Sequence, residues 1–207
     1  MSGPIPKENI AKACVSGIKS AQKQYENMSG DWVYWAPEYF ITSCIAQKLH
    51  QQKGNKYITI ENSAYEALNE AGAIGRGRLH RDIRSNGRFD IILWWAKGDP
   101  RAVIEIKNRV FNRTQYEPDL KRIMGVLSRK SLKSSIQFGI FAFYMAANQS
   151  KKKSAMNIMQ QRLLTIEANV SEILGRDFKY KVFFKSDHDN ESAWYAVSLL
   201  IEHNQRG

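Results

Sequence analysis

The centre of the chain constrains the fold most, because two apolar segments there flank a short turn-forming sequence. Residues 89–96 and 101–108 are rich in β-branched and aromatic side chains, and Lys-Gly-Asp-Pro lies between them at 97–100. Gly, Asp and Pro favour turns, and apolar segments on both sides of a turn favour strands. The sequence therefore predicts a β-hairpin whose two strands are largely buried.

The rest of the chain alternates between helical and strand patterns. Apolar residues spaced three or four apart predict helices over 5–28, 37–52, 64–70, 118–130 and 150–174. Runs of β-branched and aromatic residues predict further strands over 57–60, 136–145, 180–185 and 194–201. Because several strands are apolar on both faces, we expect an α/β fold with a mixed central sheet flanked by helices.

The chain is long enough to form one substantial core. It has 207 residues, of which 43% are hydrophobic. We expect a single domain over 1–207, with an N-terminal helical extension (1–36), a central core (37–145) and a long helix with closing strands (146–207). The apolar stripe of that long helix is expected to pack in the core, with a dimer seam as the alternative.

The charge of the chain is strongly positive. It carries 31 Lys and Arg against 20 Asp and Glu, a net charge of +11, which points to a polyanionic partner and first of all to nucleic acid. A long uncharged apolar stretch and a secretory signal are both lacking, so we expect no membrane segment and a cytoplasmic protein. Cys14 and Cys44 lie far apart in helical patterns and are expected to be buried, reduced thiols.

Three charged side chains are expected to meet on the central hairpin. Side chains alternate across a strand, so Glu105 and Lys107 share one face. If the hairpin pairs residues whose numbers sum to 195–197, Asp90 lies opposite that segment. Both carboxylates have large apolar neighbours in the sequence, so each needs a charged partner, a metal ion or a solvated edge.

Two carboxylates and a strand carbonyl are suitable ligands for a hard divalent cation such as Mg²⁺, which keeps several of its waters. Such a cation can activate water and neutralise charge on a phosphodiester, and a neighbouring lysine can orient the water or stabilise developing charge. The alternative interpretation is two surface acids and a salt-bridging lysine at a sheet edge.

The sequence Gly-Arg-Phe-Asp at 87–90, followed after a short gap by Glu-Ile-Lys at 105–107, resembles the signature of the PD-(D/E)XK nuclease superfamily. The match covers about residues 37–122. The resemblance implies a restriction-endonuclease-like fold and a Mg²⁺- or Mn²⁺-dependent nuclease of restriction, repair or anti-phage systems. It also implies that Asp90 and Glu105 are metal ligands and that the Ile106 carbonyl is a third ligand. Lys107 would be the catalytic lysine. Arg88 stands where the family's name has proline, at a position that commonly varies.

Members of this superfamily often add a glutamate from an early helix, and Glu38 matches that place. Its spacing continues into an apolar stripe that faces the sheet, formed by Ile41, Ile45 and Leu49. The alternative is that Glu38 only complements the positive N-terminus of its helix. The resemblance also implies that polar side chains of a later helix approach the site, and Gln115, Asp119 and Arg122 are the candidates. A solvated helix face is the alternative, which we expect for all three.

A basic segment leads into the first hairpin strand. Arginine binds phosphate through a two-pronged donor geometry, so this segment is predicted to contact a nucleic-acid backbone. The predicted contact residues are Arg76, Arg78, Arg81, Arg84 and Arg88, with His80 among them. The alternative is a solvated loop. Core packing, rather than stacking on bases, is expected for the large aromatic residues Trp32, Trp35, Trp94 and Trp95.

These features predict a metal-dependent nuclease that acts first of all on DNA, with RNA as a substrate and a homodimer or partner protein left open. One alternative is a nucleic-acid-binding subunit with the same fold and no catalytic activity. A further alternative is a small-molecule or protein-interaction domain whose charge is incidental.

Overall fold

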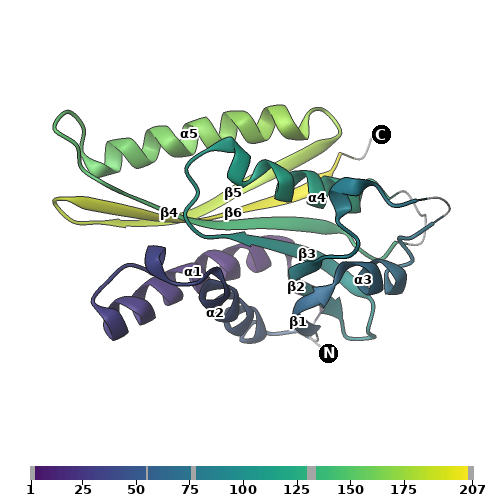
Figure 1. Cartoon of the computed structure of the whole chain (residues 1–207). Coiled ribbons are helices and arrows are strands. Elements are labelled where there is room, and N and C mark those ends of the chain that lie inside the picture. Colours follow the sequence, from purple (N-terminus) through teal and green to yellow (C-terminus); the bar gives the residue numbers. More distant parts are fainter. Residues whose placement is uncertain (1–2, 55, 76–77, 130–133, 205–207) are drawn as a thin grey trace.

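The computed structural model describes residues 3–54, 56–75, 78–129 and 134–204, which form an α/β structure (Figure 1). Six strands make one mixed sheet: β1 (Lys56–Ser63), β2 (Arg88–Trp95), β3 (Pro100–Lys107), β4 (Phe138–Asn148), β5 (Phe178–His188) and β6 (Ser192–His203). Their order across the sheet is β1-β2-β3-β4-β6-β5. Strands β3 and β4 run parallel, and the other neighbouring pairs run antiparallel. The predicted mixed sheet flanked by helices is thus confirmed.

Strands β2 and β3 form the predicted hairpin, with ends within one residue of the expected ones. Ile91 pairs with Ile104 and Leu93 with Ala102, which is the predicted register. Gly98 in the turn has a φ of 99°, in the left-handed region that favours glycine. Because the pairing ends at Ile91, Asp90 lies just beyond the last backbone pair of the hairpin.

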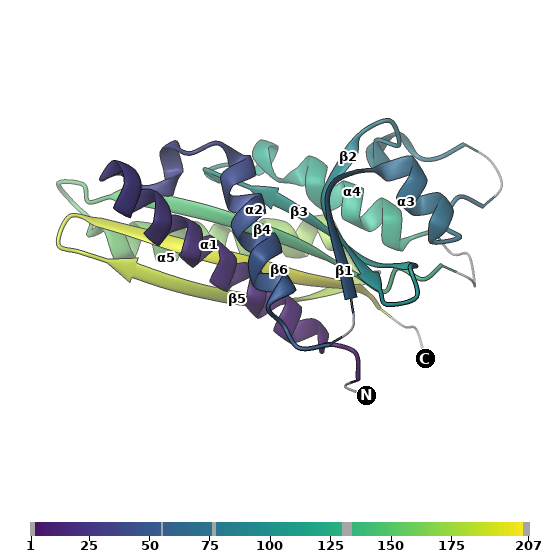
Figure 2. The same cartoon turned by 90° about the horizontal axis from the view of Figure 1, so that it is seen from below.

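Helices cover both faces of the sheet, as Figures 1 and 2 show. One face packs against α1 (Lys7–Ser29) and α2 (Glu38–His50), and the other against α4 (Glu117–Leu127) and α5 (Ala155–Leu174). The short helix α3 (Ala64–Glu70) belongs to the core on the α4 side. In β3, Ile104 and Ile106 belong to the core between the sheet and helices α1 and α2. Val103 belongs to the core between the sheet and helices α4 and α5. By alternation, Glu105 and Lys107 project toward α4.

The N-terminal helix α1 packs closely on α2 and so fixes the position of the helix that carries Glu38. A side-chain carbon at Gly17 of α1 would lie 2.5 Å from the Cα atom of Ile45 in α2, so only glycine permits this approach. Cys14 and Cys44 are buried free thiols, as predicted. Among the described residues, three 3₁₀ turns connect the larger elements: η1 (Val33–Trp35), η2 (Arg81–Ile83) and η3 (Arg113–Gln115).

Helix α5 begins at Ala155, later than the predicted residue 150. The Ser154 hydroxyl accepts a hydrogen bond from the backbone N–H of Asn157 at 3.3 Å and caps the helix there. The Ser150 hydroxyl instead accepts from the backbone N–H of Lys153 at 3.1 Å, which closes a separate turn. The apolar stripe of α5, which includes Met159 and Leu163, is buried in the core as predicted.

Candidate active site

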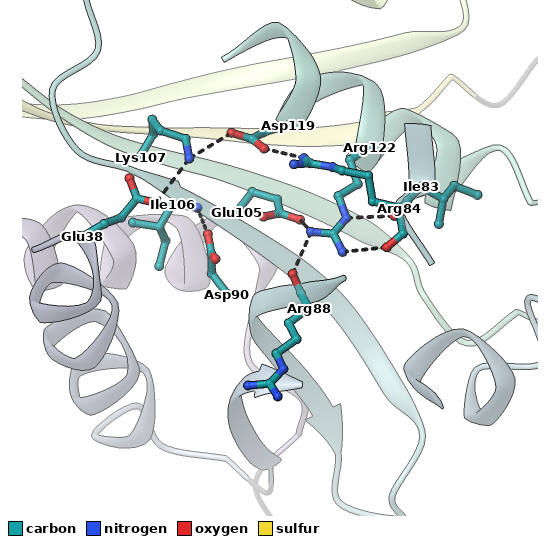
Figure 3. Close-up of polar contacts among 10 residues, drawn as sticks. All are labelled: Glu38, Ile83, Arg84, Arg88, Asp90, Glu105, Ile106, Lys107, Asp119 and Arg122. Atoms are coloured by element: carbon teal, nitrogen blue, oxygen red, sulfur yellow. Dashed lines mark hydrogen bonds and ion pairs between the residues drawn. The ribbon is translucent and has the colours of Figure 1, made fainter. Parts of the chain in front are cut away.

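The ends of β2 and β3 bring Asp90 close to the Glu105–Lys107 segment (Figure 3). The Asp90 Oδ2 atom accepts a hydrogen bond of 2.6 Å from the backbone N–H of Ile106. The aspartate side chain thereby replaces a backbone acceptor at the point where the pairing of β2 with β3 ends. Because the N–H and C=O groups of one strand residue point the same way, the Ile106 carbonyl also faces the Asp90 side.

Glu105 forms a buried ion pair with Arg122 of α4. The Arg122 Nη1 atom lies 2.9 Å from the Glu105 Oε1 atom, and each side chain is about 4% exposed. The guanidinium also donates to the carbonyls of Ile83 at 2.9 Å and Arg88 at 2.7 Å, and it lies over the Phe89 ring. These three donated hydrogen bonds and the aromatic neighbour hold Arg122 in one position.

The prediction of a solvated α4 face was wrong for Asp119 and Arg122, which are both buried. These residues share the helical face of Ile123 and Val126 through their spacing of three and four positions, and that apolar face packs on the sheet. The same spacing was the sequence signal that could have found them. Gln115 has another role, because its Oε1 atom accepts from the backbone N–H groups of Phe111 and Asn112 and shapes the loop before α4.

Lys107 stands between two carboxylates from different helices. Its Nζ atom lies 3.2 Å from Glu38 Oε1 and 3.5 Å from Asp119 Oδ2. The second Glu38 oxygen accepts from the backbone N–H of Asn108 at 2.8 Å, and the second Asp119 oxygen pairs with Arg84 at 2.6 Å. Glu38 therefore contacts the hairpin, in addition to lying in the first turn of α2.

Burial and mutual repulsion perturb the acids of this cluster. Burial is the main cause that raises the pKa of Asp90 to about 6, and the nearby charges of Glu38 and Asp119 add to the rise. Burial also raises the pKa of Glu105 well above its ordinary value, against the opposing effect of Arg122, and the Asp90 charge raises it further. The charge of Asp90 therefore reaches Glu105, although burial is the main cause of the raised pKa of each acid.

The pKa of Lys107 is also raised, but here neighbouring charges, not burial, cause the rise. Burial alone would lower the pKa of Lys107, but the carboxylates of Asp119, Glu38 and Asp90 outweigh burial and raise it. Lys107 is therefore a charged hydrogen-bond donor at neutral pH, and it is unsuited to act as a general base.

The basic segment before β2 is only partly connected to this cluster. Arg84 pairs with Asp119 and adopts a φ of 51°, a conformation that costs free energy in a residue other than glycine. With Arg78 and Arg81 it lines an open hollow of about 680 Å³. The Arg88 side chain points away from Glu105 and only its carbonyl contacts Arg122 (Figure 3). Arg76 lies outside the described residues.

The prediction of core packing was wrong for one of the four tryptophans. Trp94 is buried, and Trp32 and Trp95 are half-buried. Trp35 is 63% exposed, because it lies in the 3₁₀ turn η1, where Val33 alone is buried.

The donor set suits a divalent cation held by two carboxylates and one carbonyl. Within the described ranges, no three Asp, Glu, His or Cys side chains converge to hold a metal ion by themselves. Asp90 and Glu105 each use one oxygen in the contacts given above, and burial raises the pKa of both, so a bound cation would stabilise their charged forms. Because Mg²⁺ keeps several waters, these two acids and the Ile106 carbonyl provide enough protein ligands.

Comparisons with known proteins give no family assignment. No protein-family model matches the chain, and neither the curated proteins nor the solved structures contain a match to it. In the part of the chain that the structure describes, every helix is too short or too polar to cross a membrane. The function is therefore inferred from the geometry of the site.

Proposed function

We propose that this chain is a metal-dependent nuclease that hydrolyses phosphodiester bonds, first of all those of DNA, on a restriction-endonuclease-like fold. The observation that carries the proposal is the convergence of Asp90, Glu105 and Lys107 at the ends of two adjacent strands. The charge of Asp90 adds to the rise that burial causes in the pKa of Glu105, and Lys107 shares the α4 face of β3 with Glu105. A chain with a net charge of +11 supports a polyanionic substrate for this cluster.

The proposed mechanism assigns a separate task to each side chain. The carboxylates of Asp90 and Glu105 and the Ile106 carbonyl would hold Mg²⁺ or Mn²⁺, which when bound polarises the phosphate and activates water. The Lys107 ammonium donates to the attacking water or to a phosphate oxygen as charge develops on it. Glu38, at 3.2 Å from the ammonium, orients Lys107. Arg84, whose side chain is 47% exposed, binds a flanking phosphate.

One observation favours a second candidate, a nucleic-acid-binding subunit without catalytic activity. Arg122 already compensates the Glu105 charge inside the fold, so this ion pair can serve structure alone. A subunit of this kind would bind DNA equally well in Mg²⁺ and in EDTA and would leave it uncut. An interaction domain with incidental charge would instead fail to bind DNA at physiological salt.

Cleavage assays with different cations and substrates test the proposed function. The purified protein is incubated with linear DNA, circular DNA and RNA in Mg²⁺, Mn²⁺ or EDTA, and we expect DNA cleavage with either cation and none in EDTA. The Lys107→Ala protein, prepared identically, should not cut. Lys97→Ala changes an exposed lysine in the turn of the same hairpin and should cut like the wild type. Full activity of Lys107→Ala, or cleavage that persists in EDTA, would contradict the proposal.

Cation binding should depend on pH through Asp90. The pKa of this carboxyl is raised to about 6, so protons compete with Mg²⁺ below that pH and binding releases a proton. We expect protonation of Asp90 to lower the Mg²⁺ affinity by up to about tenfold for each pH unit below 6, and protonation of Glu105, whose pKa is also raised, to lower it further. Isothermal titration calorimetry between pH 5 and 7.5, in buffers of different ionisation enthalpy, measures both quantities. Equal affinity at pH 5 and pH 7.5 would argue against Asp90 as a ligand.

A further inference from the structure

A pocket with aromatic walls opens beside the proposed active site. Its volume is about 440 Å³, and its lining includes Tyr34, Trp35, Phe111 and Asn148. Trp35 is 63% exposed and Phe111 is 40% exposed, so both rings offer surface that the core does not use. An open pocket with exposed rings is suited to a flat ligand that stacks on them.

One wall of the pocket is hydrogen-bonded to the chain just beyond β3, the strand that carries Glu105 and Lys107. Asn108 follows Lys107, and its buried side-chain amide donates to the carbonyls of Val33 and Ala36, both at 3.0 Å. These bonds fasten η1, which carries Trp35, to the end of β3. Phe111 is four residues beyond Lys107, so their Cα atoms lie at most about 14 Å apart. Successive nucleotides of one DNA strand are spaced about 3.4 Å apart along the helix axis. The distance between Lys107 and Phe111 therefore corresponds to at most about four nucleotides.

Guanidinium groups flank the aromatic walls. Arg109 lies over the Tyr34 ring at 5.4 Å from the ring centre, and Arg162 lies over the Phe111 ring at 5.3 Å. Arg109 is exposed and has a φ of 61°. Rings for stacking beside cations for phosphates match the two parts of a nucleotide. An apolar peptide would leave the exposed Arg109 charge without a counterion.

We infer that this pocket binds an unstacked nucleobase of the strand whose phosphodiester lies at Asp90, Glu105 and Lys107. The inference rests on the proposed function and adds a substrate preference to it. A base can enter the pocket only after it leaves its duplex partner and its neighbours in the stack. The protein should therefore prefer single-stranded or locally unpaired nucleic acid, with Trp35 as the main stacking surface.

Binding assays without divalent cation test this inference separately from cleavage. Fluorescence anisotropy in EDTA, at 150 mM salt, measures the affinity for a labelled single-stranded DNA 20-mer and for the duplex of the same sequence. Trp35→Ala should weaken single-strand binding about 5- to 160-fold, the range for loss of one base-aromatic stack, and should affect duplex binding less. Trp35→Phe should retain most of the affinity, because it keeps an aromatic ring. Tyr57→Ala removes a ring that is 61% exposed on β1, and its binding should match the wild type.

The outcomes separate this inference from the proposed function. If the wild type binds DNA and Trp35→Ala binds the single strand equally well, the pocket is not a base-binding site, and the nuclease proposal is unaffected. Equal losses for the two DNA forms, or for Trp35→Ala and Tyr57→Ala, would also overturn the inference. If the wild type binds neither form, the pocket inference and the proposal of a nucleic-acid substrate are both wrong.

Discussion

Replacing Asp90 with asparagine is expected to abolish cleavage and to stabilise the fold at neutral pH. Cleavage should fall at least about a thousandfold, because a neutral amide is a poor ligand for a hard cation. The amide oxygen can still accept the hydrogen bond from the Ile106 N–H that Asp90 accepts at 2.6 Å. The variant therefore removes the charge and keeps the local structure.

The stabilisation follows from the pKa of Asp90, which rises from an ordinary value of 3.8 to about 6. A carboxyl whose pKa is raised by folding contributes its full stability below pH 4, and this contribution is lost as the pH rises through 6. The ionised form then costs at most about 3 kcal/mol. At pH 7.5, without divalent cation, Asp90→Asn should melt about 3–10 °C above the wild type. At pH 4 the two proteins should melt alike.

Differential scanning calorimetry at both pH values measures this effect, with Asp99→Asn as the matched control. Asp99 pairs with Lys97 in the exposed turn of the same hairpin, so its replacement should change stability by less than about 1 kcal/mol. A melting temperature of Asp90→Asn below that of the wild type at pH 7.5 would show that Asp90 is not under electrostatic strain. Undiminished cleavage would exclude it as a cation ligand.

Replacing Arg122 with alanine should destabilise the protein by about 3–5 kcal/mol, the usual loss when one partner of a buried ion pair is removed. Glu105 would be left buried without its counterion, the Arg122 guanidinium, whose Nη1 atom lies 2.9 Å from Glu105 Oε1 in the wild type. The carbonyls of Ile83 and Arg88 would also lose a donor. Urea denaturation measures the change in the free energy of unfolding.

A second substitution separates the charge effect from the loss of packing. Glu105→Gln in the Arg122→Ala background removes the uncompensated charge and should recover a large part of the lost stability. Lys121→Ala is the control, because Lys121 lies on the same helix and pairs with Glu117 on the surface. It should cost no more than about 0.5 kcal/mol. If Arg122→Ala were as stable as Lys121→Ala, the buried ion pair would contribute nothing to the fold.

The hairpin and its charged residues could be predicted because their determinants are local. A turn around Gly98 sets the register of β2 against β3, and strand alternation then places Glu105 and Lys107 on one face. The extents of the outer strands were harder to predict. The structure extends β5 over Phe178–His188, beyond the predicted 180–185, because backbone pairing with β6 continues along its exposed residues.

Short-range turn geometry and the two-residue period of a strand are sufficient to specify the hairpin, its register and the three charged residues at its end. Tertiary contacts, in contrast, place Arg122 of α4 against Glu105 and leave Trp35 exposed. Those outcomes depend on where α4 lies along the sheet and on where η1 is held. Both depend on contacts between residues far apart in the chain, such as Arg122 with Ile83 and Asn108 with Val33, which no local pattern specifies.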